Sequence, residues 1–151
     1  MHYISGLYAL NIPCKLRTFG DWHYYSLNWD DIPLWNSGES PWGEYGIETN
    51  RFIGGYDKPF NVANHIRAVL DLIRTGQFTL LQGMRRELIS NDSYNKEIFE
   101  KVVMLKEQEN WISIHQFMCG EYKFIWNKFL HPEMKSLLTG KLYGKKMSNE
   151  R

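Results

Sequence analysis

The sequence changes character near residue 60, and this change limits the folds that the chain can adopt. Residues 1–60 hold seven of the 12 glycines and four of the 5 prolines, whereas apolar residues recur at helical spacing after residue 60. Glycine and proline interrupt helices and favour turns. We therefore expect a mostly α, α+β fold: an irregular, aromatic-rich N-terminal part with a small β-hairpin, a helical body from about residue 61 to 139, and a basic tail at residues 140–151.

The two parts are expected to form one domain over residues 1–151. A chain of 151 residues has the length of one domain, and a glycine-rich stretch of this size buries too little surface to fold alone. Four basic and seven acidic residues give the first 60 residues a net charge of −3, so the remainder carries +4 of the total +1. With 43% hydrophobic residues and this low net charge, an intrinsically disordered chain is excluded.

Apolar spacing predicts four helical stretches after residue 60. They are residues 61–75 with Asn61 as the N-cap, a short helix at 79–89, a third at 94–108 and a long one at 111–130, with further turns at 133–139. The apolar faces define a predicted core: Ile66, Val69, Ile73, Leu81, Met84, Ile98, Val102, Leu105, Ile114, Met118 and Ile125.

The N-terminal part shows weaker patterns. Residues 15–19 and 23–29 alternate with period two around Gly20 and Asp21, which predicts a hairpin, and residues 47–53 fit another short strand. Residues 7–12 fit a strand or a helical turn equally well.

The standard motifs for nucleotide, dinucleotide, zinc-hydrolase and serine-hydrolase chemistry are absent, so we expect no cofactor and no metal. Cys14 and Cys119 match no metal spacing and are expected to be free thiols. The sequence has no apolar run long enough to span a membrane and no signal-peptide pattern, so we expect no membrane contact and a cytoplasmic location.

The densest set of chemically capable side chains lies around the predicted turn. Arg17, Asp21 and His23 fall within seven positions, and an aspartate beside a histidine can fix its tautomer while an arginine binds an anion. His65 lies at the edge of the first helical stretch and could converge with this set near the helix N-terminus, where backbone amides favour anions. The set predicts catalytic residues if the protein is an enzyme; the simpler interpretation is an exposed turn beside a histidine that packs against the helix.

The 23 aromatic residues point instead to contact with another protein. Four of the six tryptophans, Trp22, Trp29, Trp35 and Trp42, lie in the loop-rich, acidic part, where burial of every ring is difficult. The leading hypothesis is a small binding or regulatory protein that uses these rings on a protein partner, a class that includes bacterial antitoxins and phage-defence accessory proteins. The alternatives are a small enzyme or small-ligand binder, and a weak nucleic-acid binder. Nucleic acid is the less expected partner because the N-terminal part is acidic.

Overall fold

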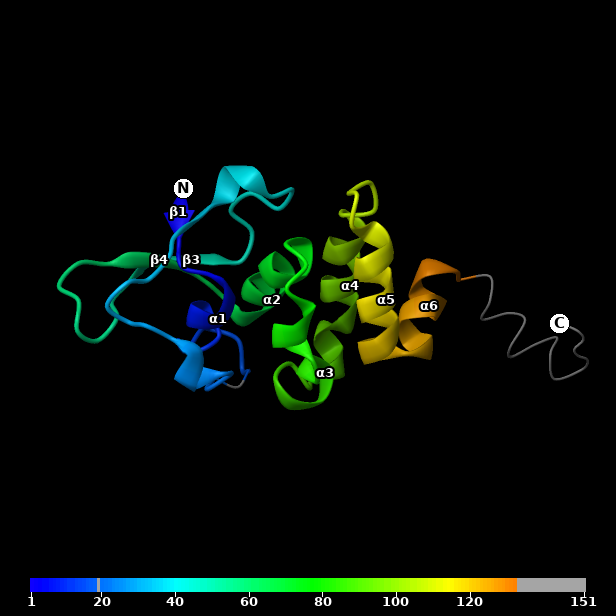
Figure 1. Cartoon of the computed structure of the whole chain (residues 1–151), viewed down its shortest axis with the longest axis horizontal. Coiled ribbons are helices and arrows are strands. Elements are labelled where there is room, and N and C mark those ends of the chain that lie inside the picture. The colour runs from blue at the N-terminus through cyan, green and yellow to red at the C-terminus, as the bar shows by residue number, and fades with distance from the viewer. Residues whose placement is uncertain (19, 133–151) are drawn as a thin grey trace, which may run out of the picture.

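The computed structural model describes residues 1–18 and 20–132 (Figure 1) and has the expected mostly helical α+β fold. The N-terminal strands and helix α1 lie at one end and α6 lies at the other, with α2 between them. The α-helices are α1 (Gly6–Ala9), α2 (His65–Arg74), α3 (Met84–Glu87), α4 (Asn95–Val103), α5 (Trp111–Tyr122) and α6 (Phe124–Leu130). The short 3₁₀ turns are η1 (Tyr24–Ser26), η2 (Ser37–Glu39), η3 (Phe78–Leu81) and η4 (Asp92–Tyr94).

The small hairpin is present, but not where the alternating pattern predicted it. Strand β3 (Ile47–Arg51) pairs antiparallel with β4 (Phe60–Ala63), and β1 (His2–Tyr3) pairs with β2 (Trp35–Asn36). The predicted strands are wrong, since residues 15–18 and 23–29 form none: Asp21, in the predicted turn, and His23, at the start of the second stretch, adopt left-handed backbone angles and lead into η1. The alternation of rings in this region therefore does not reflect a pleated strand.

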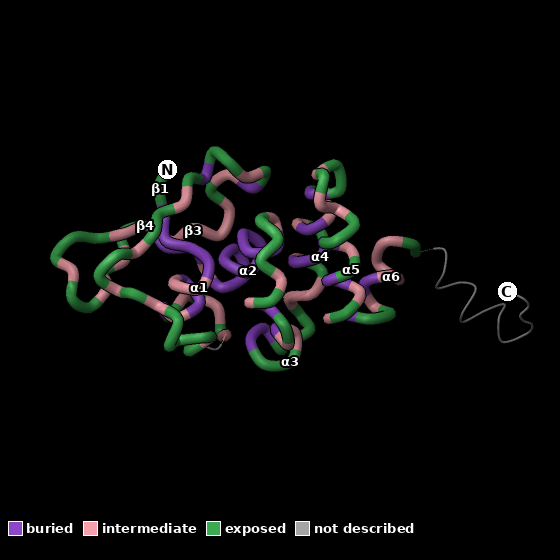
Figure 2. Tube along the Cα trace, viewed as in Figure 1, coloured by how far each residue is buried: buried purple, intermediate pink, exposed green. Residues whose placement is uncertain are grey.

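Helix α2 is the centre of the molecule. Its N-cap is Asn64, whose side chain accepts the backbone N–H of Arg67, and not Asn61, which lies in β4. The helix packs between α1 and α4, and residues 65–73 are all buried, as the tube in Figure 2 shows. A helix buried on every side has no solvent face, so its polar side chains need partners inside the protein.

The later helices are shorter than predicted. Gly83, with a φ of 84°, separates η3 from α3 within the stretch 79–89, and α4 ends at Val103 instead of near residue 108. The long stretch 111–130 is broken at Lys123, whose φ of 55° and ψ of −134° end α5 and start α6. The further turns at 133–139 and the basic tail at 140–151 lie outside the described residues.

The predicted core is confirmed at ten of its eleven positions, which are at most 1% exposed; the exception, Ile125, is half-buried. One continuous apolar cluster runs from Tyr3 in β1 to Trp126 in α6 and includes residues from both parts of the chain. None of the described helices is both long enough and apolar enough to cross a membrane.

Candidate functional site at the start of helix α2

A buried ion pair fixes the N-terminal part against α2. Arg67 donates from Nε to Asp71 over 3.2 Å, and neither side chain is exposed to solvent. The other guanidinium N–H groups reach the carbonyl oxygens of residues 43 and 45, Tyr3 Oη and Ser40 Oγ. Ser5 and Tyr3 donate to the second oxygen of Asp71. Arg67 is therefore a structural residue, and its guanidinium N–H groups are all engaged inside the protein.

His65, the first residue of α2, faces a different group of residues. Its Nε2 lies 2.8 Å from the carbonyl oxygen of Ile12, and its Nδ1 lies 2.6 Å from the hydroxyl oxygen of Thr18. The sulfur of Cys14 lies 3.7 Å from the same hydroxyl. Three residues of the segment after α1 thus surround the imidazole.

These contacts determine where the protons lie. A carbonyl oxygen only accepts hydrogen bonds, so Nε2 of His65 carries a proton and donates it to Ile12. In the neutral ring Nδ1 is then an acceptor, and Thr18 donates to it. The Thr18 oxygen is then an acceptor for the Cys14 thiol, whose sulfur also lies 3.9 Å from the carbonyl oxygen of Leu16. The result is a chain of hydrogen bonds from Cys14 through Thr18 to His65.

The electrostatics of the pair agree with this chain. Burial raises the pKa of the Cys14 thiol, but hydrogen bonding to His65 and the charge of His65 outweigh burial, so the pKa lies below its ordinary value. Burial lowers the pKa of His65, but its interaction with Cys14, its hydrogen bond to Ile12 and the negative charges of Cys14 and Glu48 raise it overall. Both shifts favour a thiolate beside an imidazolium.

A hollow of about 480 Å³ opens beside His65. We call it the Asp21–His65 hollow; it is lined by Asn11, Pro13, Thr18, Gly20, Asp21 and His65. Cys14 is not part of this lining, but its sulfur contacts Thr18, which is. The volume lies within the range of small-molecule sites, about 300 to 1,000 Å³.

Two other contacts hold the turn that carries Asp21. The side chain of Asn11 donates to the carbonyl oxygen of Trp22 over 2.8 Å, and the indole of Trp22 donates to the carbonyl oxygen of Leu80 over 2.7 Å. Asp21 has a φ of 67°, a left-handed conformation that aspartate tolerates better than most residues. The Asp21 side chain is exposed, and none of the other described residues forms a hydrogen bond with its carboxylate.

The structure therefore brings together only half of the predicted catalytic set. Asp21 and His65 line one hollow, although they are far apart in sequence. Arg17 and His23 are exposed and are not among the lining residues, and the His23 ring contacts that of Trp22.

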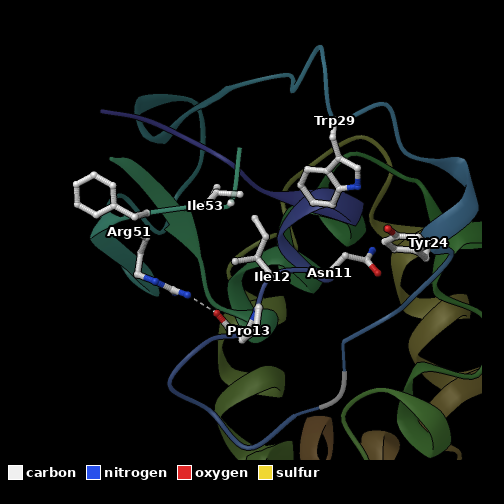
Figure 3. Close-up of a pocket in the computed structure, with 9 residues that line it drawn as sticks. Asn11, Ile12, Pro13, Tyr24, Trp29, Arg51 and Ile53 are labelled. Atoms are coloured by element: carbon white, nitrogen blue, oxygen red, sulfur yellow. Dashed lines mark hydrogen bonds between the residues drawn. The ribbon is translucent and has the colours of Figure 1, made fainter. Parts of the chain in front are cut away.

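A second hollow, of about 490 Å³, neighbours the first and shares Asn11 and Pro13 with it (Figure 3). We call it the aromatic hollow; its lining is completed by Ile12, Tyr24, Trp29, Arg51, Phe52, Ile53 and Gly54. Arg51 forms an ion pair with Glu48 and donates to the Pro13 carbonyl oxygen, drawn as a dashed line in Figure 3. This contact links β3 to the segment that carries Cys14.

The four tryptophans do not form an exposed patch. Trp42 is 6% exposed and donates to the carbonyl oxygen of Lys101, while Trp22, Trp29 and Trp35 are half-buried against the core. Among the described residues of this part, the exposed aromatic rings are instead those of Tyr24, Tyr25 and Phe52.

Comparison with known protein families, characterised proteins and solved structures finds no match to this chain. Within the described residues, no group of three or more His, Cys, Asp or Glu side chains is arranged to hold a metal ion. Both cysteines are free thiols, as predicted. The conclusions about function therefore rest on the geometry of the site alone.

Sequence reasoning missed Cys14 and Thr18. They precede His65 by about fifty residues, and no spacing rule joins a cysteine to a histidine on a distant helix. Asn11 was equally hidden, because its role depends on the turn at Asp21 that it supports.

Proposed function

We propose that this protein binds a small molecule carrying an amino group in the Asp21–His65 hollow. The observation that carries the proposal is the hollow itself, which is lined by Asp21, whose exposed carboxylate forms no hydrogen bond with the other described residues. Both ring nitrogens of His65 are engaged with Ile12 and Thr18. The open acceptor of the hollow is thus a carboxylate, which favours a cationic donor.

Two features support a binding site here. The Asn11 amide nitrogen donates to two carbonyl oxygens, those of Leu7 and Trp22, so the orientation of this side chain is fixed and its oxygen has no hydrogen-bond partner. Two hydrogen bonds of Trp22 hold the turn next to Asp21 without any ligand. A site that is already formed loses less conformational entropy on binding.

The proposal is tested by NMR titration of labelled protein with small primary amines, with small carboxylates as the contrasting probes. Amines should shift signals of residues 11–23 and of His65, and Asp21→Asn should weaken their binding about tenfold. Asp30→Asn is the matched control, because Asp30 is also exposed but is not in the lining of the hollow. Equal binding to the wild-type and Asp21→Asn proteins would contradict the proposal.

A protein partner is the second candidate, and the exposed rings favour it. Tyr25 is 99% exposed and Phe52 is 70% exposed, and Phe52 borders the aromatic hollow. Large exposed aromatic rings are typical of protein contact sites. The second proposal is therefore that these two rings, and not the tryptophans, contact a protein partner. A regulatory role, such as that of an antitoxin or a defence accessory protein, belongs to this second proposal.

Affinity purification with mass spectrometry tests this second candidate. Replacing Tyr25 and Phe52 together by alanine should remove a specific partner, while Ile112→Ala should not, although Ile112 is 71% exposed on α5. Retention of the same partner by the double variant would count against the contact. A cytoplasmic location is part of both proposals and is supported by the two free thiols.

A further inference from the structure

Cys14 and Cys119 each lie near a histidine, but the two histidines differ in the nitrogen that is open to a proton. The indole N–H of Trp126 donates to Nδ1 of His115 over 3.0 Å, so this nitrogen is an acceptor, and the proton of the neutral ring is on Nε2. Nε2 is the atom that lies 3.6 Å from the sulfur of Cys119. His115 therefore donates towards Cys119 and has no free lone pair to take its proton.

At Cys14 the arrangement is reversed. The Ile12 carbonyl holds the proton of His65 on Nε2, which leaves the lone pair on Nδ1 directed at Thr18. When Nδ1 takes a proton, the imidazolium donates to Thr18 on one side and to Ile12 on the other. Both of its N–H groups are satisfied, so the structure accepts the charged ring without rearrangement.

We propose that Cys14 is a nucleophilic thiol, activated by His65 through the Thr18 hydroxyl, and that it exchanges with small disulfides that enter the Asp21–His65 hollow. The pKa shifts of the two groups agree in direction. This inference depends on the proposed function in one respect only, namely that the disulfide enters through the same hollow. Cys14 is half-buried, and its sulfur contacts Thr18, which lines the hollow.

The exchange reaction needs only groups that are present. The Cys14 thiolate attacks one sulfur of a disulfide RS–SR, a bond forms between Cys14 and SR, and the original S–S bond breaks. The leaving thiolate RS⁻ keeps the electron pair of that bond and takes the proton that His65 holds on Nδ1, through Thr18. The products are a mixed disulfide on Cys14 and one RSH, with no other oxidant required. The Asp21 carboxylate favours a disulfide with amino groups.

The charged groups around His65 are few. Cys14 and Glu48 act on it directly, Glu48 is paired with Arg51, and Asp21 lines the same hollow. Arg67 is on the same helix but is fully engaged with Asp71 and its other partners. The pH dependence of the reaction therefore reports on the pair formed by Cys14 and His65.

The test measures disulfide exchange on the full chain with hydroxyethyl disulfide from about pH 5 to about pH 9, followed by peptide mapping of each cysteine. Cys14 should react at least about tenfold faster than Cys119 near neutral pH, with a midpoint below the ordinary thiol value of about 8.5. In unfolded protein the two should react alike. Cys14→Ser should remove the fast adduct. A native Cys119 that reacts as fast as Cys14 would overturn the inference without any variant.

Thr18→Val tests the path of the proton, because valine keeps the shape and lacks the hydroxyl. It should slow the reaction of Cys14 near neutral pH about tenfold and move the midpoint towards the ordinary value; an unchanged profile in a folded variant would overturn the relay. Cystamine, a cationic disulfide, separates this inference from the amine site. Wild-type protein should prefer it to hydroxyethyl disulfide, and Asp21→Asn should lose the preference. Fast exchange without that preference would refute the amine site and leave the activated thiol standing.

Discussion

Arg67 donates to Asp71 one helical turn further along α2, and both side chains are completely buried. Each of the five guanidinium N–H groups has an acceptor, and the ring centroids of Tyr3 and Trp42 lie 5.0 and 5.7 Å from the guanidinium carbon. The acceptors come from β1, from residues 40–45 and from α2 itself. This single side chain therefore joins the N-terminal part to the central helix.

Replacing Arg67 by methionine should destabilise the fold by about 3 to 5 kcal/mol, because it leaves the buried charge of Asp71 without its partner. Urea unfolding followed by circular dichroism measures the loss. Arg51→Met is the matched control, since Arg51 forms a partly exposed ion pair with Glu48, and it should cost only about 1 kcal/mol or less. Similar losses in the two variants would show that Arg67 does not have this role.

Gly46 should tolerate no side chain, because the backbone packs directly on α2 at this point. A Cβ there would lie 2.7 Å from Cβ of Arg67, and the residue has a φ of 74°. Gly43 also has a positive φ, 54°, but a Cβ there meets nothing within 4 Å. Gly43→Ala should cost about 1 to 2 kcal/mol from backbone strain alone, and Gly46→Ala about 1 to 3 kcal/mol more. Denaturant melts of the two variants separate the effects; equal costs would contradict the close packing.

Helical periodicity predicted the core because it reports directly on which side of a helix is buried, and Ile66 and Val102 are examples at 0% exposure. The helix limits were harder to predict. Asn61 and Asn64 are both suitable caps, and only the pairing of β4 with β3 shows that the helix starts at the second. The break at Lys123 has no glycine or proline to mark it.

The site was only half predicted for a related reason. Asp21 and His65 were singled out by residue type, and their approach depends on the path of the chain over α2, which no local pattern encodes. Arg17 and His23 are also ionisable and lie in the same segment, yet they do not line the hollow. Cys14 acquires its reactivity from Thr18 and His65, so its role becomes visible only in three dimensions.

The raised pKa of His65 should depend on the thiolate of Cys14. Cys14→Ser replaces the thiol by a hydroxyl of similar shape that does not ionise, so the pKa of His65 should fall towards its ordinary value of about 6.5. Glu48→Gln should lower it in the same direction, because its negative charge also favours the imidazolium. Proton NMR titration of the His65 ring measures both shifts. A pKa that rises in Cys14→Ser would contradict the ion pair.

Substitutions at Trp42 and Tyr25 should distinguish a ring that stabilises the fold from a ring that is available to a partner. Trp42 is buried beside Arg67, so Trp42→Ala should destabilise the protein by about 3 to 5 kcal/mol. Tyr25 is almost fully exposed, and Tyr25→Ala should change stability by no more than about 0.5 kcal/mol. Thermal melts measure both effects. A strongly destabilised Tyr25→Ala protein would show that this ring packs against the fold and is not available to a partner.

Lys123 should be a position where glycine stabilises the protein. Its φ of 55° and ψ of −134° are unfavourable for any residue with a Cβ, and they allow α5 to turn into α6 so that Trp126 reaches His115. Lys123→Gly removes this strain and should raise the free energy of unfolding by about 1 kcal/mol, measured in urea. Lys123→Ala is the control, because it removes the same charge and length but keeps the Cβ, and it should bring no such gain. If both variants were more stable than the wild-type protein, the effect would be due to the lysine charge. If Lys123→Gly were less stable, the lysine side chain would stabilise the turn through its contacts and the backbone would not be strained.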